Sequence, residues 1–118
     1  MRSKIINTSL NLIGEKVQTF QNGGKIAVIC DSNVYDLYYE KCRQSLADAG
    51  FVTICYKFPS GESNKNGKIY LKIMNFLAEN KLSRSDAVMA LGGGVTGDIA
   101  GFAAATYLRG IRVIQVPT

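Results

Sequence analysis

Hydrophobic and polar positions alternate along the chain with two periods, one typical of helices and one typical of strands. Leu10, Ile13, Val17 and Phe20 recur at helical spacing, so we expect an amphipathic helix over residues 8–21. Apolar runs and strict alternation predict strands over residues 26–30, 51–58, 87–91 and 111–116. Helical spacing between them predicts further helices over residues 34–49, 69–80 and 97–109.

Strands and helices follow one another in turn from residue 26 onward. Such alternation is typical of a parallel sheet, because each crossover helix returns the chain to the edge where the previous strand began. The predicted fold class is therefore α/β, with a Rossmann-like parallel sheet and flanking helices. No shift in composition divides the 118 residues, so we expect a single domain over residues 1–118.

Composition and charge narrow the classes of function. The net charge is +5, but the basic residues are scattered and form no stripe with aromatic residues, which argues against a nucleic-acid partner. The apolar stretch over residues 99–108 is too short to span a bilayer. Widely spaced cysteines (Cys30, Cys42 and Cys55) and the lack of a signal-peptide pattern predict reduced thiols and a cytoplasmic location. The sequence contains no histidine, which excludes a histidine base or a histidine metal ligand within these residues.

Polar loops follow three of the predicted strands, over residues 31–33, 60–65 and 92–98. In a parallel sheet these loops share the carboxyl edge, where ligands usually bind. Residues 92–97 read Gly-Gly-Gly-Val-Thr-Gly and match G-x-G-x-x-G between a strand and a helix. The pattern predicts a site where backbone N–H groups and a helix N-terminus hold a phosphate. The alternative is a glycine turn that serves only close packing of helix and sheet.

Two charged residues flank the predicted helix over residues 97–109. Asp98 at its start either caps the helix or accepts hydrogen bonds from a ligand. Arg109 at its end either complements the helix dipole or binds a phosphate. The helix between them consists mostly of small and apolar residues, so we expect it to be buried between the sheet and another domain or subunit.

The segment from Gly92 to Gly110, continued by Ile114-Gln115-Val116-Pro117-Thr118, resembles the signature of the 3-dehydroquinate synthase family. Residues 60–65 (Ser-Gly-Glu-Ser-Asn-Lys) are similar to that family's D-G-E-x-x-K loop, and residues 31–33 (Asp-Ser-Asn) to its D-x-N motif. The family binds NAD and a divalent metal, zinc or cobalt. Its members convert 3-deoxy-D-arabino-heptulosonate 7-phosphate to 3-dehydroquinate and phosphate in the shikimate pathway, which leads to the aromatic amino acids.

The resemblance implies roles for individual residues. Arg109 would bind the phosphorylated keto-sugar acid, acting across the interface of a homodimer. Cofactor contacts would come from Asp31, Asn33, Ser60, Gly61, Glu62, Lys65, Gly93, Gly94, Val95, Thr96, Gly97, Asp98 and Thr118.

The chain departs from the family pattern at Ser60, which stands where Asp is usual, and at Asn66, where Ser or Thr is common. The family's metal ligands, a glutamate and two histidines, lie in a helical domain beyond the matching segment. We therefore expect residues 1–118 to form the nucleotide-binding domain without the metal-binding domain, and to be inactive alone. Two alternatives stay open: another sugar phosphate cyclase or a polyol dehydrogenase-like enzyme, and a non-catalytic nucleotide-binding module. Gly101 argues against the dehydrogenases, which usually carry Lys at this position.

Overall fold

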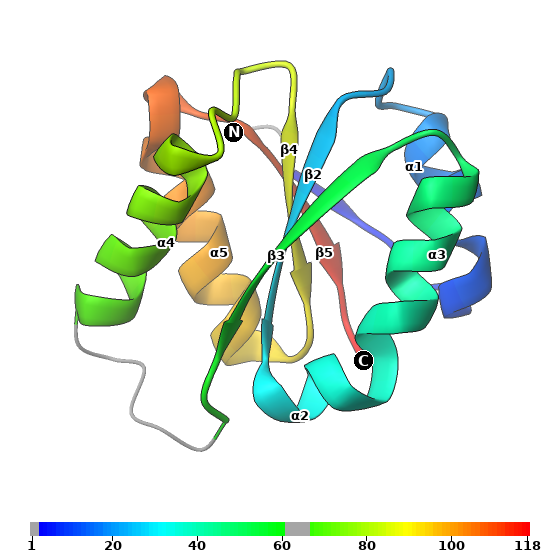
Figure 1. The fold of residues 1–118 in the computed structure, drawn as a ribbon, viewed down its shortest axis with the longest axis horizontal. Coiled ribbons are helices and arrows are strands. Elements are labelled where there is room, and N and C mark those ends of the chain that lie inside the picture. Colours follow the sequence, from blue (N-terminus) through cyan, green and yellow to red (C-terminus); the bar gives the residue numbers. More distant parts are fainter. Residues whose placement is uncertain (1–2, 61–66) are drawn as a thin grey trace.

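The computed structural model describes residues 3–60 and 67–118, which form a five-stranded parallel sheet with helices on both faces (Figure 1). The strand order is β1-β5-β4-β2-β3. The strands are β1 (Ser3–Ile5), β2 (Lys25–Asp31), β3 (Val52–Phe58), β4 (Ala87–Leu91) and β5 (Arg112–Val116). Every pairing between neighbouring strands is parallel, which confirms the predicted α/β class.

Helices and turns connect the strands. The α-helices are α1 (Ile13–Gln18), α2 (Ser32–Val34), α3 (Glu40–Asp48), α4 (Gly67–Glu79) and α5 (Gly94–Thr106). Shorter segments of tighter or wider helix are η1 (Leu10–Leu12), η2 (Tyr35–Tyr39) and η3 (Tyr107–Arg109), of which η2 is π-helical. In the described part of the chain, no helix is long and apolar enough to cross a membrane.

Two apolar cores lie on opposite faces of the sheet. On one face α1 and α3 cover alternate residues of the strands, including Ile26, Val28 and Met89. On the other face α4 and α5 cover the residues between them, including Ala27 and Val88. Figure 1 shows the two helical layers on either side of the twisted sheet. Strands buried on both faces explain why β2 and β4 read as continuous apolar runs.

The strand β1 is absent from the sequence-based prediction. Only three residues long, it pairs with β5 through the register Lys4↔Ile114. Its neighbour Ile6 is buried in the core beneath α1 and α3, whereas Ile5 is 68% exposed. A segment this short carries no readable alternation, so its pairing follows from the free edge of β5 and the burial of Ile6.

The first two predicted helices differ in detail from those observed. The expected helix over residues 8–21 is a short 3₁₀ turn, η1, followed by the six-residue α1. The expected helix over residues 34–49 begins earlier, at Ser32, and passes through the π-helical η2 before α3. In η2 the rings of Tyr35 and Tyr39 stack with their centroids 4.9 Å apart.

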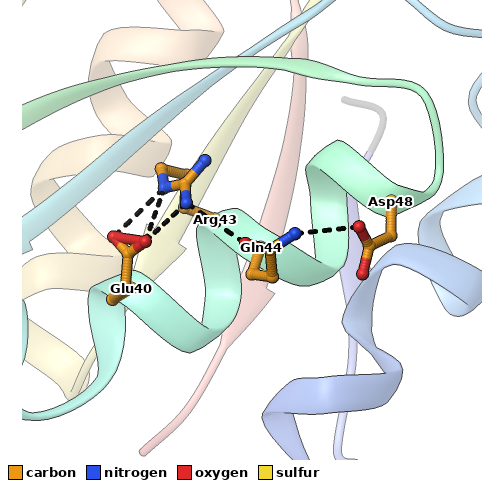
Figure 2. Close-up of polar contacts among 4 residues, drawn as sticks. All are labelled: Glu40, Arg43, Gln44 and Asp48. Carbon is orange, nitrogen blue, oxygen red and sulfur yellow. Dashed lines mark hydrogen bonds and ion pairs between the residues drawn. The ribbon is translucent and has the colours of Figure 1, made fainter.

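The outer face of α3 carries a chain of polar contacts (Figure 2). Arg43 pairs with Glu40 one turn earlier, and Gln44 donates a hydrogen bond from Nε2 to Oδ1 of Asp48 at 2.8 Å. Hydrogen bonding to the neighbouring guanidinium lowers the pKa of Glu40 below its usual value. These groups are at the surface, where such pairs add little to stability.

The predicted helix over residues 97–109 is displaced by one turn, since α5 runs from Gly94 to Thr106. Its N-terminal cap is Gly93, and the backbone N–H of Gly97 donates to the carbonyl of Gly93 at 3.0 Å. At the other end, Leu108 and Arg109 adopt positive φ angles of 50° and 65°. Arg109 therefore does not end the helix, as the sequence suggested, but lies in a turn beyond it.

Candidate functional site

The carboxyl ends of β2, β3, β4 and β5 meet at one edge of the sheet, at the bottom of Figure 1. Asp31 is the last residue of β2, Ser60 lies two residues beyond β3, and Thr118 lies two residues beyond β5. The glycine turn, which we define as Gly92, Gly93 and Gly94, follows β4 directly. Since β4 lies between β5 and β2, the glycine turn occupies the middle of this edge.

The glycine turn leaves its backbone open to the surroundings. Gly92 has a φ of +146°, which favours glycine, and its N–H donates to the carbonyl of Val116 at 3.1 Å. Gly93 and Gly94 are exposed, and a Cβ built on either would meet no atom within 4 Å. Because the packing of the chain does not require glycine at 93 and 94, the open backbone is typical of a place where a ligand approaches closely.

The first turn of α5 provides hydrogen-bond donors beside the exposed glycines. The first N–H groups of a helix have no carbonyl partner within it, and the helix dipole makes this end positive. An anion bound beside Gly93 and Gly94 would accept hydrogen bonds from these N–H groups, and no side chain would have to move. Exposed Val95 lies beside this position, whereas Thr96 is only 3% exposed and its side chain lies against Gly92.

Gly97, the last glycine of the motif, serves packing. A Cβ at Gly97 would lie 2.5 Å from Oε1 of Gln115, a residue of β5. The two interpretations of the motif thus apply to different glycines: Gly97 allows helix and sheet to approach, and Gly93 and Gly94 leave backbone available. Asp98, expected at the helix start, lies in the second turn of α5 and is exposed.

Asp31 and its neighbours form the second part of the carboxyl edge. Oδ1 of Asp31 accepts a hydrogen bond from the N–H of Val34 at 2.8 Å and so caps α2. This cap holds the carboxylate in place and does not use Oδ2. Asn33, within α2, is exposed. Ser32 joins this segment to the next loop, because its Oγ accepts a hydrogen bond from the N–H of Ser60 at 3.0 Å.

Arg109 lies apart from the other predicted site residues. It follows the C-terminal end of α5, and thirteen helical residues separate that end from the glycine turn by about 20 Å. Arg109 is exposed near the amino ends of the strands. Gly61, Glu62 and Lys65, the remaining predicted cofactor contacts, lie outside the described residues.

Comparison with known proteins identifies the family. Residues 55–118 match the family model described as 3-dehydroquinate synthase N-terminal. The chain belongs to the 3-dehydroquinate synthase family. It is 47% identical over 110 residues to 3-dehydroquinate synthase from Streptococcus suis, an alignment that covers 93% of this chain and 31% of the relative. The enzyme of the same name from Lactococcus lactis is 46% identical over 97% of this chain and 32% of the relative.

A solved structure with a similar fold is that of 2-deoxy-scyllo-inosose synthase in complex with carbaglucose-6-phosphate, NAD⁺ and Co²⁺. The TM-score is 0.80 at 25% identity, over 98% of this chain and 32% of that chain. The chain thus spans about a third of the length of the family members and of this structure. The resemblance noted from the motifs is confirmed at the level of family and fold.

The thiols and carboxylates of residues 3–60 and 67–118 do not gather into a metal site. Among the described residues, no group of three or more Cys, Asp and Glu side chains could hold a metal ion. Sγ of Cys30 and Sγ of Cys55 are 3.9 Å apart, but Cys55 pairs in register with Val28, two residues before Cys30. Diagonal neighbours on adjacent strands have Cα atoms roughly 7–8 Å apart, too far for a disulfide without backbone movement. These cysteines therefore pack as free thiols.

Two residues of the carboxyl edge escaped the sequence analysis. Ser32 lies inside the D-x-N motif, but its hydrogen bonds to Ser60 depend on strands β2 and β3 being neighbours. Gln115 is a polar residue in an otherwise apolar part of β5, and its Nε2 donates to the carbonyl of Gly97 at 3.3 Å. In the sequence, the contact of Gln115 with α5 is indicated only by a single polar residue in an apolar strand and by glycines in the neighbouring helix.

Proposed function

We propose that residues 1–118 form the NAD-binding domain of a 3-dehydroquinate synthase. The observation that carries this proposal is the open backbone of Gly93 and Gly94 at the N-terminus of α5, in the middle of the carboxyl edge. Family membership and the relatives' names support the enzyme class. The similar structure that contains NAD⁺ supports the cofactor.

The pyrophosphate of NAD would lie on the glycine turn, where it would accept hydrogen bonds from the N–H groups of the first turn of α5. Oδ2 of Asp31, held in place by the cap on α2, would accept hydrogen bonds from ribose hydroxyls. Asn33, Ser60, Glu62 and Lys65 would complete the adenosine side. Exposed Asp98 and Thr118 would hold the nicotinamide half. When bound, NAD⁺ would accept a hydride from the ring carbon that carries a substrate hydroxyl, and the NADH formed would return it later in the same turnover.

The remaining parts of the proposed reaction need residues outside this chain. The described residues hold no cluster that fits a divalent metal, and the sequence has no histidine. The family members are about three times longer than the chain. We infer that a metal-binding domain in a longer polypeptide completes the site, and that residues 1–118 are inactive alone.

The cofactor site is tested by Gly94→Ala in the complete polypeptide that carries this chain. Alanine has room there and suits a helix, so the melting temperature should stay the same or rise. The methyl group would instead meet the pyrophosphate, and NAD affinity measured by calorimetry should fall by about tenfold or more. Gly101→Ala, one turn beyond Gly97 in the same helix, should leave NAD affinity unchanged. Equal NAD affinity in wild type and Gly94→Ala would contradict the site.

The reaction itself is tested by phosphate release. The complete polypeptide should release phosphate from 3-deoxy-D-arabino-heptulosonate 7-phosphate only when NAD and a divalent metal are present. Another sugar phosphate cyclase would release phosphate only from a different sugar phosphate. A protein that binds NAD yet releases no phosphate from any of these substrates would support the non-catalytic alternative.

A further inference from the structure

The side chain of Gln115 bridges β5 and the first turns of α5. Gln115 is half-buried, on the sheet face that α5 covers. Its Nε2 donates to the carbonyl of Gly97 at 3.3 Å. The amide also lies against the places that side chains would occupy at two glycines of α5: Oε1 is 2.5 Å from a Cβ built at Gly97, and Nε2 is 3.8 Å from one built at Gly101.

Gly97 leaves room for the amide of Gln115. Real Cβ atoms do not approach an oxygen to 2.5 Å, so alanine at position 97 would push the amide of Gln115 away. At Gly101 the corresponding distance is an ordinary van der Waals contact, and alanine would be accommodated. Gln115 and Gly97 thus form a direct contact between β5 and the first turn of α5.

The contacts of α5 farther along the helix are of a different kind. Ala100, Ala103 and Ala104 bury small apolar side chains against the sheet. Apolar contacts are not directional, so they permit small slides and rotations of a helix. A hydrogen bond requires a particular distance and angle. The bond from Gln115 acts three residues after Gly94 and therefore constrains the end of α5 that carries the glycine turn.

We propose that Gln115 is a positioning residue: it holds the N-terminus of α5 so that the N–H groups at the glycine turn point at the cofactor's pyrophosphate. This inference rests on the proposed NAD site but assigns Gln115 no contact with NAD. Its effect on binding passes through Gly97 and the first turn of α5.

The first test replaces Gln115 by leucine, which is similar in size and cannot donate, in the complete polypeptide. Losing one hydrogen bond that orients the helix should weaken NAD binding about three- to tenfold. The KM for NAD should rise while kcat at saturating NAD changes little. The matched control is Gln18→Leu, because Nε2 of Gln18 also donates to a backbone carbonyl, that of Ala49 at 2.8 Å, away from the carboxyl edge. Gln18→Leu should leave NAD affinity at the wild-type value.

The second test is a double-mutant cycle between positions 97 and 115. Gly97→Ala displaces the amide of Gln115, so it should weaken NAD binding to about the same degree as Gln115→Leu. Gln115→Ala removes the amide altogether, and Gly97→Ala added to it should cause little further loss. If the double variant instead lost NAD affinity by the product of the two single losses, positions 97 and 115 would act independently, and the proposal would be overturned.

The outcomes separate this inference from the proposed function. No NAD binding by the wild-type protein would refute the NAD site itself. Wild-type NAD binding with an unchanged affinity in Gln115→Leu would refute only the positioning role. A lower melting temperature in Gln115→Leu with unchanged NAD affinity would likewise overturn the proposal, because it would make Gln115 a packing residue.

Discussion

Whether a glycine of this chain is required for packing depends on the atoms that surround it. Gly97 and Gly14 face atoms that a methyl group would strike, whereas Gly93 and Gly94 face none. At the carboxyl edge of the sheet, a glycine that packing does not require is the stronger indication of a ligand, since its cost in backbone entropy brings no gain in packing. The sequence motif G-x-G-x-x-G does not distinguish these cases.

Cys42 gives a prediction at the residue scale. Burial raises the pKa of its thiol to about 12. The thiol stays protonated in the folded state but ionises in the unfolded state above a pH of about 8.5. Its contribution to stability is therefore complete below that pH and is lost as the pH rises toward 12. Each pH unit between about 8.5 and 12 lowers the free energy of unfolding by up to about 1.4 kcal/mol.

Cys42→Ala should make the free energy of unfolding less dependent on pH between 9 and 11. Urea titrations of the 118-residue chain at several pH values would measure the slope. Gln44→Ala on the exposed face of the same helix (Figure 2) removes no titrating group and should keep the wild-type slope. An unchanged slope in Cys42→Ala would mean that the thiol ionises equally well in the folded state.

Among the elements, α1 and α3 approach each other closely at Gly14 and Ser45. The N–H of Gly14 donates to Oγ of Ser45 at 2.8 Å, and a Cβ at Gly14 would lie 2.1 Å from the carbonyl oxygen of Ser45. The obstacle is backbone rather than a flexible side chain, so the two helices would have to separate. The short α1 can cover the core only because position 14 has no side chain.

Gly14→Ala should therefore lower the free energy of unfolding by about 1–3 kcal/mol. Gly67→Ala, at the first residue of α4, is the control, because a Cβ there meets nothing within 4 Å. That change should be neutral or stabilise the chain by up to about 1 kcal/mol. Denaturant titration of both variants gives the comparison, and equal stabilities would show that α1 and α3 are not held this closely.

Helices and strands could be predicted where the apolar pattern was long and no glycine or other turn residue interrupted it. The strands β2, β3, β4 and β5 and the helix α4 follow from apolar patterning. The start of α5 was misplaced because three glycines resemble a loop, whereas here Gly94 already belongs to the helix. The motifs pointed to Asp31, Gly93 and Gly94, and the structure brings these residues to the carboxyl edge, where their role in binding NAD stays a prediction. The bridging roles of Ser32 and Gln115 were not, because they depend on which strands and helices become neighbours.

At the scale of the whole molecule, α5 is apolar beyond the face that packs on the sheet. Phe102 is 58% exposed, and Val95 on the same side is equally open. A helix that is apolar all round is usually covered on both sides. This agrees with the expectation that a further domain or subunit completes the protein, and with family members about three times as long.

The isolated chain should accordingly bind NAD weakly. Under the proposed function it would supply only one wall of the NAD site, and a half-site leaves most of the ligand surface in water. Calorimetric titration of residues 1–118 should give an NAD affinity at least about a hundredfold lower than that of the complete polypeptide, a difference of about 2.8 kcal/mol in binding free energy. Equal affinities would show that these residues form the whole cofactor site.

Arg109 is exposed beyond the C-terminal end of α5, at the opposite end of this helix from the glycine turn. It lies about 20 Å from the glycine turn along α5, so it cannot bind a substrate placed beside NAD on the same chain's carboxyl edge. In a homodimer, Arg109 of one subunit could reach the partner's site. A guanidinium binds phosphate through two parallel hydrogen bonds, which lysine cannot reproduce. Arg109→Lys should therefore lower kcat/KM for the phosphorylated substrate roughly tenfold to a hundredfold, with NAD affinity unchanged.

Mixing variants of the complete polypeptide tests whether Arg109 acts across the interface. Arg109→Lys subunits keep an intact glycine turn, and Gly94→Ala subunits keep an intact Arg109. A dimer of one of each would contain one site with both features. Random exchange of equal amounts should therefore restore about a quarter of the wild-type activity. If Arg109 served its own chain, every site in the mixture would be defective, and activity would stay at the sum of the two variants measured separately.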